Sequence, residues 1–146
     1  MFKKIAYILM FVSLPLVARE LTTFDNIQLR TGRGQFPTFV LNTEQCDIQD
    51  HNAFKIPHSI MVVKPSVALV LENQMVAFDG QKFAASKSPY YNYNVMQRAS
   101  LILYADGKLE EKIEFFDADH NVKSPDFDEV QVTCQLGKGL RVYDYS

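Results

Sequence analysis

The feature that most constrains the fold is a pair of β-forming segments separated by Asp106 and Gly107. Residues 94–104 (NVMQRASLILY) and 108–116 (KLEEKIEFF) are rich in apolar, β-branched and aromatic side chains. Asp-Gly suits a type I′ turn, in which both central residues have positive φ. Such a turn reverses the chain, so the two segments are expected to pair as an antiparallel hairpin.

Two further hairpins are indicated by the same kind of pattern. Residues 67–73 and 74–80 are expected to pair across a turn at residues 72–74. Residues 129–136 and 140–145 are expected to pair across Gly137, Lys138 and Gly139. In this last pair, apolar and polar side chains alternate with period two, as in a sheet with one buried face and one wet face.

The one good helix signal lies in residues 21–34. Thr22 or Thr23 is expected to cap its N-terminus, with Asp25 completing a capping-box-like arrangement, and Gly32 is expected to end it in a left-handed conformation. Pro37 makes residues 35–42 an edge strand or one with an early break. Residues 43–58 are expected to form a long loop, followed by a strand over residues 59–65.

Together these elements predict an α+β fold. We expect a mostly antiparallel sheet of about seven or eight strands, strongly curved or closed into a small barrel, with one short N-terminal helix. The prediction is a single domain over residues 19–146.

Residues 1–18 are expected to be a cleaved signal peptide. Lys3 and Lys4 precede a short apolar run that a polar, proline-containing break ends before Ala18. The mature protein is therefore expected to be periplasmic or secreted, with no membrane insertion after cleavage. Without those two lysines the chain carries thirteen basic and seventeen acidic side chains, a net charge of −4. That charge argues against nucleic acid as a partner.

The chain has two cysteines, Cys46 and Cys134. In an exported protein an even pair predicts one disulfide, here tying the front of the domain to its last strands. Chain-entropy reasoning gives a ceiling of about 4.6 kcal/mol for its contribution to stability. The alternative is a redox or nucleophilic thiol, but the sequence has no CxxC motif and no basic residue beside either cysteine.

Motifs that would indicate a reaction are weak. Asp117, Asp119, Asn121 and Asp128 match four calcium-loop positions, but Val122 stands where that loop needs glycine, so an acidic turn is the simpler interpretation. The histidine spacings match no zinc signature, and no nucleophile motif is present. The two Gly-X-Gly sequences suit turns better than anion sites. We expect no enzyme activity, no metal and no cofactor.

The tyrosine-rich stretch before residue 94 is the candidate binding surface. Tyr90, Tyr91 and Tyr93, with Phe83 and with Arg98 as a polar anchor, are the residues chosen for it. The alternative is that these rings close one end of the sheet, with their hydroxyls wet.

The order and spacing of four segments resemble those of the VirK family of small exported proteins from Gram-negative bacteria. The segments are FDNIQLRTGRGQFPTFVLNTEQC, VAFDGQKF, YNYNVMQRASLILYADGK and VTCQLGKGLRVY. The chain departs from the family at Gln81, Lys82 and Phe83, where a histidine is expected. The resemblance implies export, an association with virulence and a non-enzymatic role, and it supplies no site.

The sequence thus predicts an exported, non-enzymatic accessory protein that acts in virulence or host interaction by binding a protein or surface partner. One alternative is a periplasmic carrier that holds a small apolar ligand inside the curved sheet. An enzyme whose site is assembled from loops is a third hypothesis. The oligomeric state is left open. The side chains expected to line a carrier are Phe78, Val95, Leu101, Leu103 and Phe115.

Overall fold

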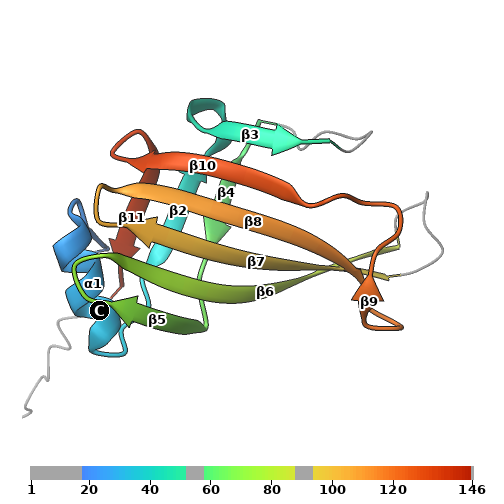
Figure 1. The fold of residues 1–146 in the computed structure, drawn as a ribbon, viewed down its shortest axis with the longest axis horizontal. Coiled ribbons are helices and arrows are strands. Elements are labelled where there is room, and N and C mark those ends of the chain that lie inside the picture. The colour runs from blue at the N-terminus through green and yellow to red at the C-terminus, as the bar shows by residue number, and fades with distance from the viewer. Residues whose placement is uncertain (1–17, 52–57, 88–93, 146) are drawn as a thin grey trace, which may run out of the picture.

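The structure, a computed structural model, describes residues 18–51, 58–87 and 94–145, with only the backbone described for residues 81–87 and 94. These residues form one α-helix, α1 (Phe24–Gly32), one 3₁₀ turn, η1 (Thr43–Gln45), and eleven strands (Figure 1). The strands are β1 (Arg19–Glu20), β2 (Thr38–Asn42), β3 (Asp47–Asp50), β4 (Ile60–Val63), β5 (Val67–Leu71), β6 (Met75–Lys87), β7 (Asn94–Tyr104), β8 (Lys108–Asp117), β9 (Val122–Lys123), β10 (Val130–Leu136) and β11 (Gly139–Asp144).

Eight strands form one curled sheet in the order β4-β2-β11-β10-β8-β7-β6-β5, and the three short strands β1, β3 and β9 pair at its margins. The long strands β6, β7, β8 and β10 run side by side, and β2, β4 and β11 cross behind them (Figure 1). The end strands β4 and β5 are joined by residues 64–66 alone, so the sheet must curl until its two ends meet at that corner. The predicted fold, a strongly curved and mostly antiparallel sheet with one short helix, is confirmed as a half-barrel.

The concave face of the half-barrel holds the core. Strands β8 and β10 alternate between buried and half-exposed side chains along their length, as period-two patterning requires. We call β6, β7, β8 and β10, with β5 beside β6, the front layer, and β2, β4 and β11 the back layer. Phe39 of β2 meets Phe78 of β6 edge to face, with ring centroids 4.9 Å apart, so the two layers touch through aromatic rings. The fully buried large side chains are Phe39, Ile27, Leu41, Leu101, Leu103, Leu109, Leu140, Glu111, Val76, Val130, Val132 and Val142.

Helix α1 closes the end of the half-barrel near β5 (Figure 1). Thr23 is its N-cap, one of the two predicted residues, and accepts a hydrogen bond from the Asn26 N–H. In the last turn Arg30 lies 3.1 Å from the buried carboxylate of Asp144 on β11, which ties the helix to the last strand. The predicted left-handed Gly32 is wrong, because the helix runs through it and Gly34 has the positive φ of 78°.

The hairpin from β7 to β8 is confirmed, but its turn differs from the prediction. Gly107 has a φ of 82°, whereas Asp106 is not among the residues with positive φ, which excludes type I′. The Gly107 N–H donates to the Tyr104 carbonyl across a three-residue loop. A three-residue loop with glycine in the left-handed conformation is compatible with the right-handed twist of the two strands, as a type I′ turn would be.

The predicted hairpin from β10 to β11 is wrong. The two strands share only two register pairs, in parallel, while β10 pairs along its length with β8 and β3, and β11 pairs with β2. Gly137 and Gly139 have φ values of 82° and 81° and turn the chain through a corner instead of reversing it. β11 therefore leaves the front layer and enters the back layer (Figure 1).

Two other local predictions need refinement. Pro37 directly precedes β2, so the early break is observed, but β2 is an interior strand between β4 and β11 rather than an edge. The segment expected to be a loop after β2 contains η1 and β3, and β3 pairs with β10. β3 pairs at the margin of the sheet and exposes alternate side chains, so its sequence is polar. A polar sequence of this kind did not predict a strand.

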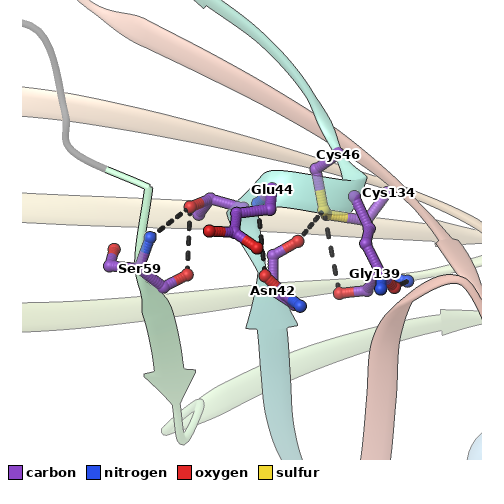
Figure 2. The surroundings of a disulfide bond; sticks show 8 residues. Asn42, Glu44, Cys46, Ser59, Cys134 and Gly139 are labelled. Atoms are coloured by element: carbon purple, nitrogen blue, oxygen red, sulfur yellow. Dashed lines mark hydrogen bonds between the residues drawn. A yellow bond between two sulfur atoms is a disulfide. The ribbon is translucent and has the colours of Figure 1, made fainter.

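The predicted disulfide between Cys46 and Cys134 is present at the β10–β11 corner (Figure 2). The two Cα atoms are 4.6 Å apart, within the range that a disulfide spans. The Cys46 sulfur lies 3.3 Å from the Asn42 carbonyl oxygen and 3.7 Å from that of Gly139. A bridged sulfur carries no hydrogen, so these are close packing contacts, and they show how tightly the corner is built.

Gly139 is required at this corner for two separate reasons. Its φ of 81° disfavours any side chain, and a Cβ there would stand 2.9 Å from the Cys46 sulfur and 2.9 Å from the Gln45 carbonyl oxygen. Gly137 has nearly the same φ, 82°, but nothing lies within 4 Å of the position of its Cβ.

We predict that Gly139→Ala destabilises the protein more than Gly137→Ala. Gly137→Ala should cost roughly 1 to 2 kcal/mol, the price of a left-handed L-residue. Gly139→Ala adds a clash with backbone and the bridge and should cost at least about twice as much. Equilibrium urea unfolding of both variants under non-reducing conditions measures the difference. Equal losses in the two variants would show that the close approach to the bridge carries no energy.

Candidate functional site

The structure places only part of the predicted tyrosine surface. Tyr90, Tyr91 and Tyr93 lie outside the described residues, and of Phe83 only the backbone, within β6, is described. Arg98 lies on the outer face of β7, with its guanidinium 4.8 Å from the ring centroid of Phe116 on β8. This cation–π contact holds Arg98 flat against the sheet, so the predicted anchor already has an intramolecular partner.

A different surface gathers recognition-type side chains. The outer faces of β2, β4 and β11 form a hollow of about 260 Å³ beside the β10–β11 corner. We call it the outer-face hollow, and it is lined by Val40, Asn42, Gln45, Ile60, Gly137, Gly139, Arg141 and Tyr143. Ile60 is 61% exposed although it is aliphatic. Apolar walls with a few polar groups at fixed positions are the usual composition of a binding site.

The polar groups of the outer-face hollow are mainly hydrogen-bond donors. The side-chain oxygen of Asn42 accepts from the Glu44 N–H, and that of Gln45 accepts from the Gly139 N–H. These bonds use the amide oxygens and leave the NH₂ groups as the donors. Tyr143 beside Arg141 raises the pKa of that guanidinium, so its positive charge is secure. The hollow therefore suits a partner group that accepts hydrogen bonds or is negatively charged.

A second tyrosine extends this surface. The Tyr145 ring is 54% exposed, and its centroid lies 6.5 Å from that of Tyr143. Tyrosine supplies large contact area at a low entropy cost, the property for which the earlier tyrosines were chosen. The alternation of β11 predicts that Arg141 and Tyr143 face outward, but Ile60 is too distant in the sequence to be joined to them without the sheet order.

Two of the weak motifs have polar groups that are engaged within the chain. At the β10–β11 corner the N–H groups of Gly137, Lys138 and Gly139 all donate within the chain, so they form no anion nest. Asp117, the first residue of the calcium-like loop, accepts from the backbone N–H groups of Asp119 and His120, and its other oxygen lies 2.7 Å from the His120 ring. That pairing raises the pKa of His120 and lowers that of Asp117.

The side chains expected to line a carrier lie on the concave face. Phe78, Leu101, Leu103 and Phe115 are buried in the core, and Val95 packs against it. They contact one another as a filled core requires, so the carrier hypothesis gains no support from them.

One member of this core is a carboxylic acid. Glu111 on β8 is 2% exposed and stands in register between Leu101 of β7 and Val132 of β10. Neither carboxyl oxygen has a hydrogen-bond partner within the described residues. Burial raises its pKa to about 7, because an ionised carboxylate in apolar surroundings loses its hydration. Its neighbour Glu110 points outward, as the alternation predicts, and is paired with Lys108.

The described residues contain neither a metal-binding cluster of side chains nor a membrane-spanning helix. No group of three or more histidine, cysteine, aspartate or glutamate side chains comes together there in a way that could hold a metal ion. No helix there is both long enough and apolar enough to span a membrane.

Comparison with known proteins identifies one shared fold. A VirK family protein from Legionella pneumophila superposes on the structure with a TM-score of 0.70, over 84% of this chain and 97% of that chain, at 23% sequence identity. No family model matches the sequence, and no curated protein does. The resemblance to the VirK family, predicted from the order of four segments, is therefore confirmed at the level of the fold.

We predict that Glu111 makes the protein less stable as the pH rises. Its pKa is about 7 in the folded protein, above the ordinary value of 4.5. Between these values the unfolded chain releases a proton that the folded chain keeps, so stability falls with rising pH and then levels above about 7. Glu111→Gln should match the parent near pH 4.5 and exceed it by roughly 3 kcal/mol at pH 8.

Glu110→Gln is the matched control for this experiment. The Lys108 ammonium and the Tyr104 hydroxyl lower the pKa of Glu110, so its contribution is present at neutral pH and lost in acid, the opposite sign. Urea unfolding of both variants from about pH 3 to 8 measures the two slopes, because the change due to Glu110 lies below its ordinary pKa of 4.5. A Glu111→Gln effect that stays constant over this range would show that Glu111 does not titrate there.

Proposed function

We propose that this protein is an exported, non-enzymatic accessory protein that acts by binding a protein or surface partner, in virulence or host interaction. The observation that carries the proposal is the outer-face hollow, where the exposed Ile60 and the half-buried Tyr143 share one surface with the Arg141 guanidinium. The partner it fits is a segment with an acidic group beside an apolar one, because the hollow offers hydrogen-bond donors between apolar walls.

Export is supported by two observations. The Cys46–Cys134 bridge is of a kind that persists in oxidising compartments, and residues 1–18 have the charge and hydropathy pattern that predicts a signal peptide. The connection with virulence is supported by the fold shared with a VirK family protein of Legionella pneumophila.

Photo-crosslinking in the native host tests binding at the outer-face hollow. We predict that a crosslinking amino acid in place of Tyr143 yields one discrete adduct, and that one in place of Gln131, exposed on β10, does not yield it. Arg141→Glu should abolish the adduct, since Arg141 is the charged side chain among the described residues that line the hollow, while leaving the melting temperature unchanged. Identical adducts at positions 143 and 131, or an adduct insensitive to Arg141→Glu, would refute the proposed surface.

Intact mass spectrometry of protein recovered from its host tests export. Under denaturing, non-reducing conditions we predict the mass of residues 19–146 minus two hydrogens, from periplasm or supernatant. The full-length mass, or two free thiols, would contradict the exported form.

A further inference from the structure

The outer face of the front layer changes from charged to apolar toward β5. One row across the strands shows this change, since Glu110 on β8 is in register with Ile102 on β7, Ile102 with Ala77 on β6, and Ala77 with Leu69 on β5. Glu110 is paired with Lys108 in water, whereas Leu69 at the end of the row is 59% exposed. A solvated sheet face should be polar throughout, so the apolar end of the row is suited to being covered.

β5 is also the last strand of the sheet at this end, and among the described residues its ladder is paired on one side alone, with β6 (Figure 1). Its residues Val67–Leu71 are all apolar and uncharged, and its outward side chains Val67, Leu69 and Leu71 are 60%, 59% and 38% exposed. It contains none of the lysines, prolines or bulges that natural edge strands use to prevent pairing. Helix α1 reaches only its far end, where Gln28 accepts from the Asn73 N–H.

We propose that β5 pairs antiparallel with β5 of a second copy of this chain, about a two-fold axis at Leu69. In that register Val67 lies opposite Leu71, Ala68 opposite Val70, and Leu69 opposite its own copy. The outward side chains of both copies form one continuous apolar strip, and all cross-strand pairs join β-forming, uncharged residues.

The flanking residues fit this register and limit it. Glu72 comes opposite Ser66 and Pro65 opposite Asn73, so no like charges meet, and proline ends the ladder because it has no N–H to donate. Pairing β5 with itself closes after two copies, whereas pairing it with a different edge would propagate into a filament.

The area favours a weak dimer. The three outward side chains together expose on the order of 300 Å² of apolar surface, less than the roughly 800 Å² per partner of a standard stable interface. The backbone ladder formed between the two five-residue strands adds hydrogen bonds to this apolar contact. We therefore expect exchange between monomer and dimer at micromolar concentrations. This surface is separate from the outer-face hollow, so either proposal can fail without the other.

Sedimentation equilibrium and crosslinking of the exported protein test the pairing. The parent should show a concentration-dependent shift from monomer to dimer between about 1 and 200 µM. Leu69→Lys places two like charges face to face at the axis and should weaken the dimer at least tenfold. Leu69→Cys should form an intermolecular disulfide on oxidation, because the two thiols meet across the axis.

Val122 on β9 is the matched control, since it is also a β-strand aliphatic and is 54% exposed. Val122→Lys should leave the dimer intact, and Val122→Cys should not crosslink. A parent that is monomeric at 200 µM would overturn the proposal, and so would a dimer that survives Leu69→Lys. Equal loss with Val122→Lys, or a filament in place of a dimer, would assign association to another surface and reject this one.

Discussion

The corner between β10 and β11 is the constraint on which the rest of the structure depends. At Gly137 and Gly139 the chain leaves the front layer and enters the back layer, so this corner joins the two layers of the half-barrel. The Cys46–Cys134 bridge fixes the same corner by tying the C-cap of η1, which follows β2, to β10. Because a Cβ at Gly139 would stand 2.9 Å from the Cys46 sulfur, the turn and the bridge are compatible only with glycine there.

The half-barrel separates the protein into surfaces with different tasks. Its concave face is filled by side chains from both layers and holds Glu111, whose carboxyl oxygens have no hydrogen-bond partner within the described residues. Its convex face is polar over β8 and β10 but apolar near β5 and at Ile60. Both apolar regions lie at the ends of the strand order, where the ladder is open.

Local chemistry made much of the fold predictable. Strand alternation placed Val132 and Cys134 inside and Arg141 outside, and an even cysteine count in a chain expected to be exported predicted the bridge. The β10–β11 corner was misread because glycines with positive φ serve equally well in a hairpin and in a corner. Which of the two forms is decided by partners far away in the sequence, and no local pattern reports them.

The candidate site was less predictable than the fold. The tyrosines chosen from composition lie outside the described residues, and the outer-face hollow joins Ile60 to Arg141, which only the strand order brings together. Glu111 could have been found, because two adjacent glutamates in a strand must place one carboxylate on each face. Its neighbours Leu109 and Ile113 mark its face as the buried one.

The strand order also determines when the chain can fold. β2 lies between β4 and β11, β1 pairs with β11, and Cys46 must wait for a partner 88 residues further on. A chain that emerges from a ribosome or a membrane pore N-terminus first therefore has no complete back layer until residues 139–144 have arrived. Such non-local pairing makes folding slow and leaves apolar strands uncovered in the meantime. The back layer therefore forms as a whole, once the last strand is free to pair with β2 and β1.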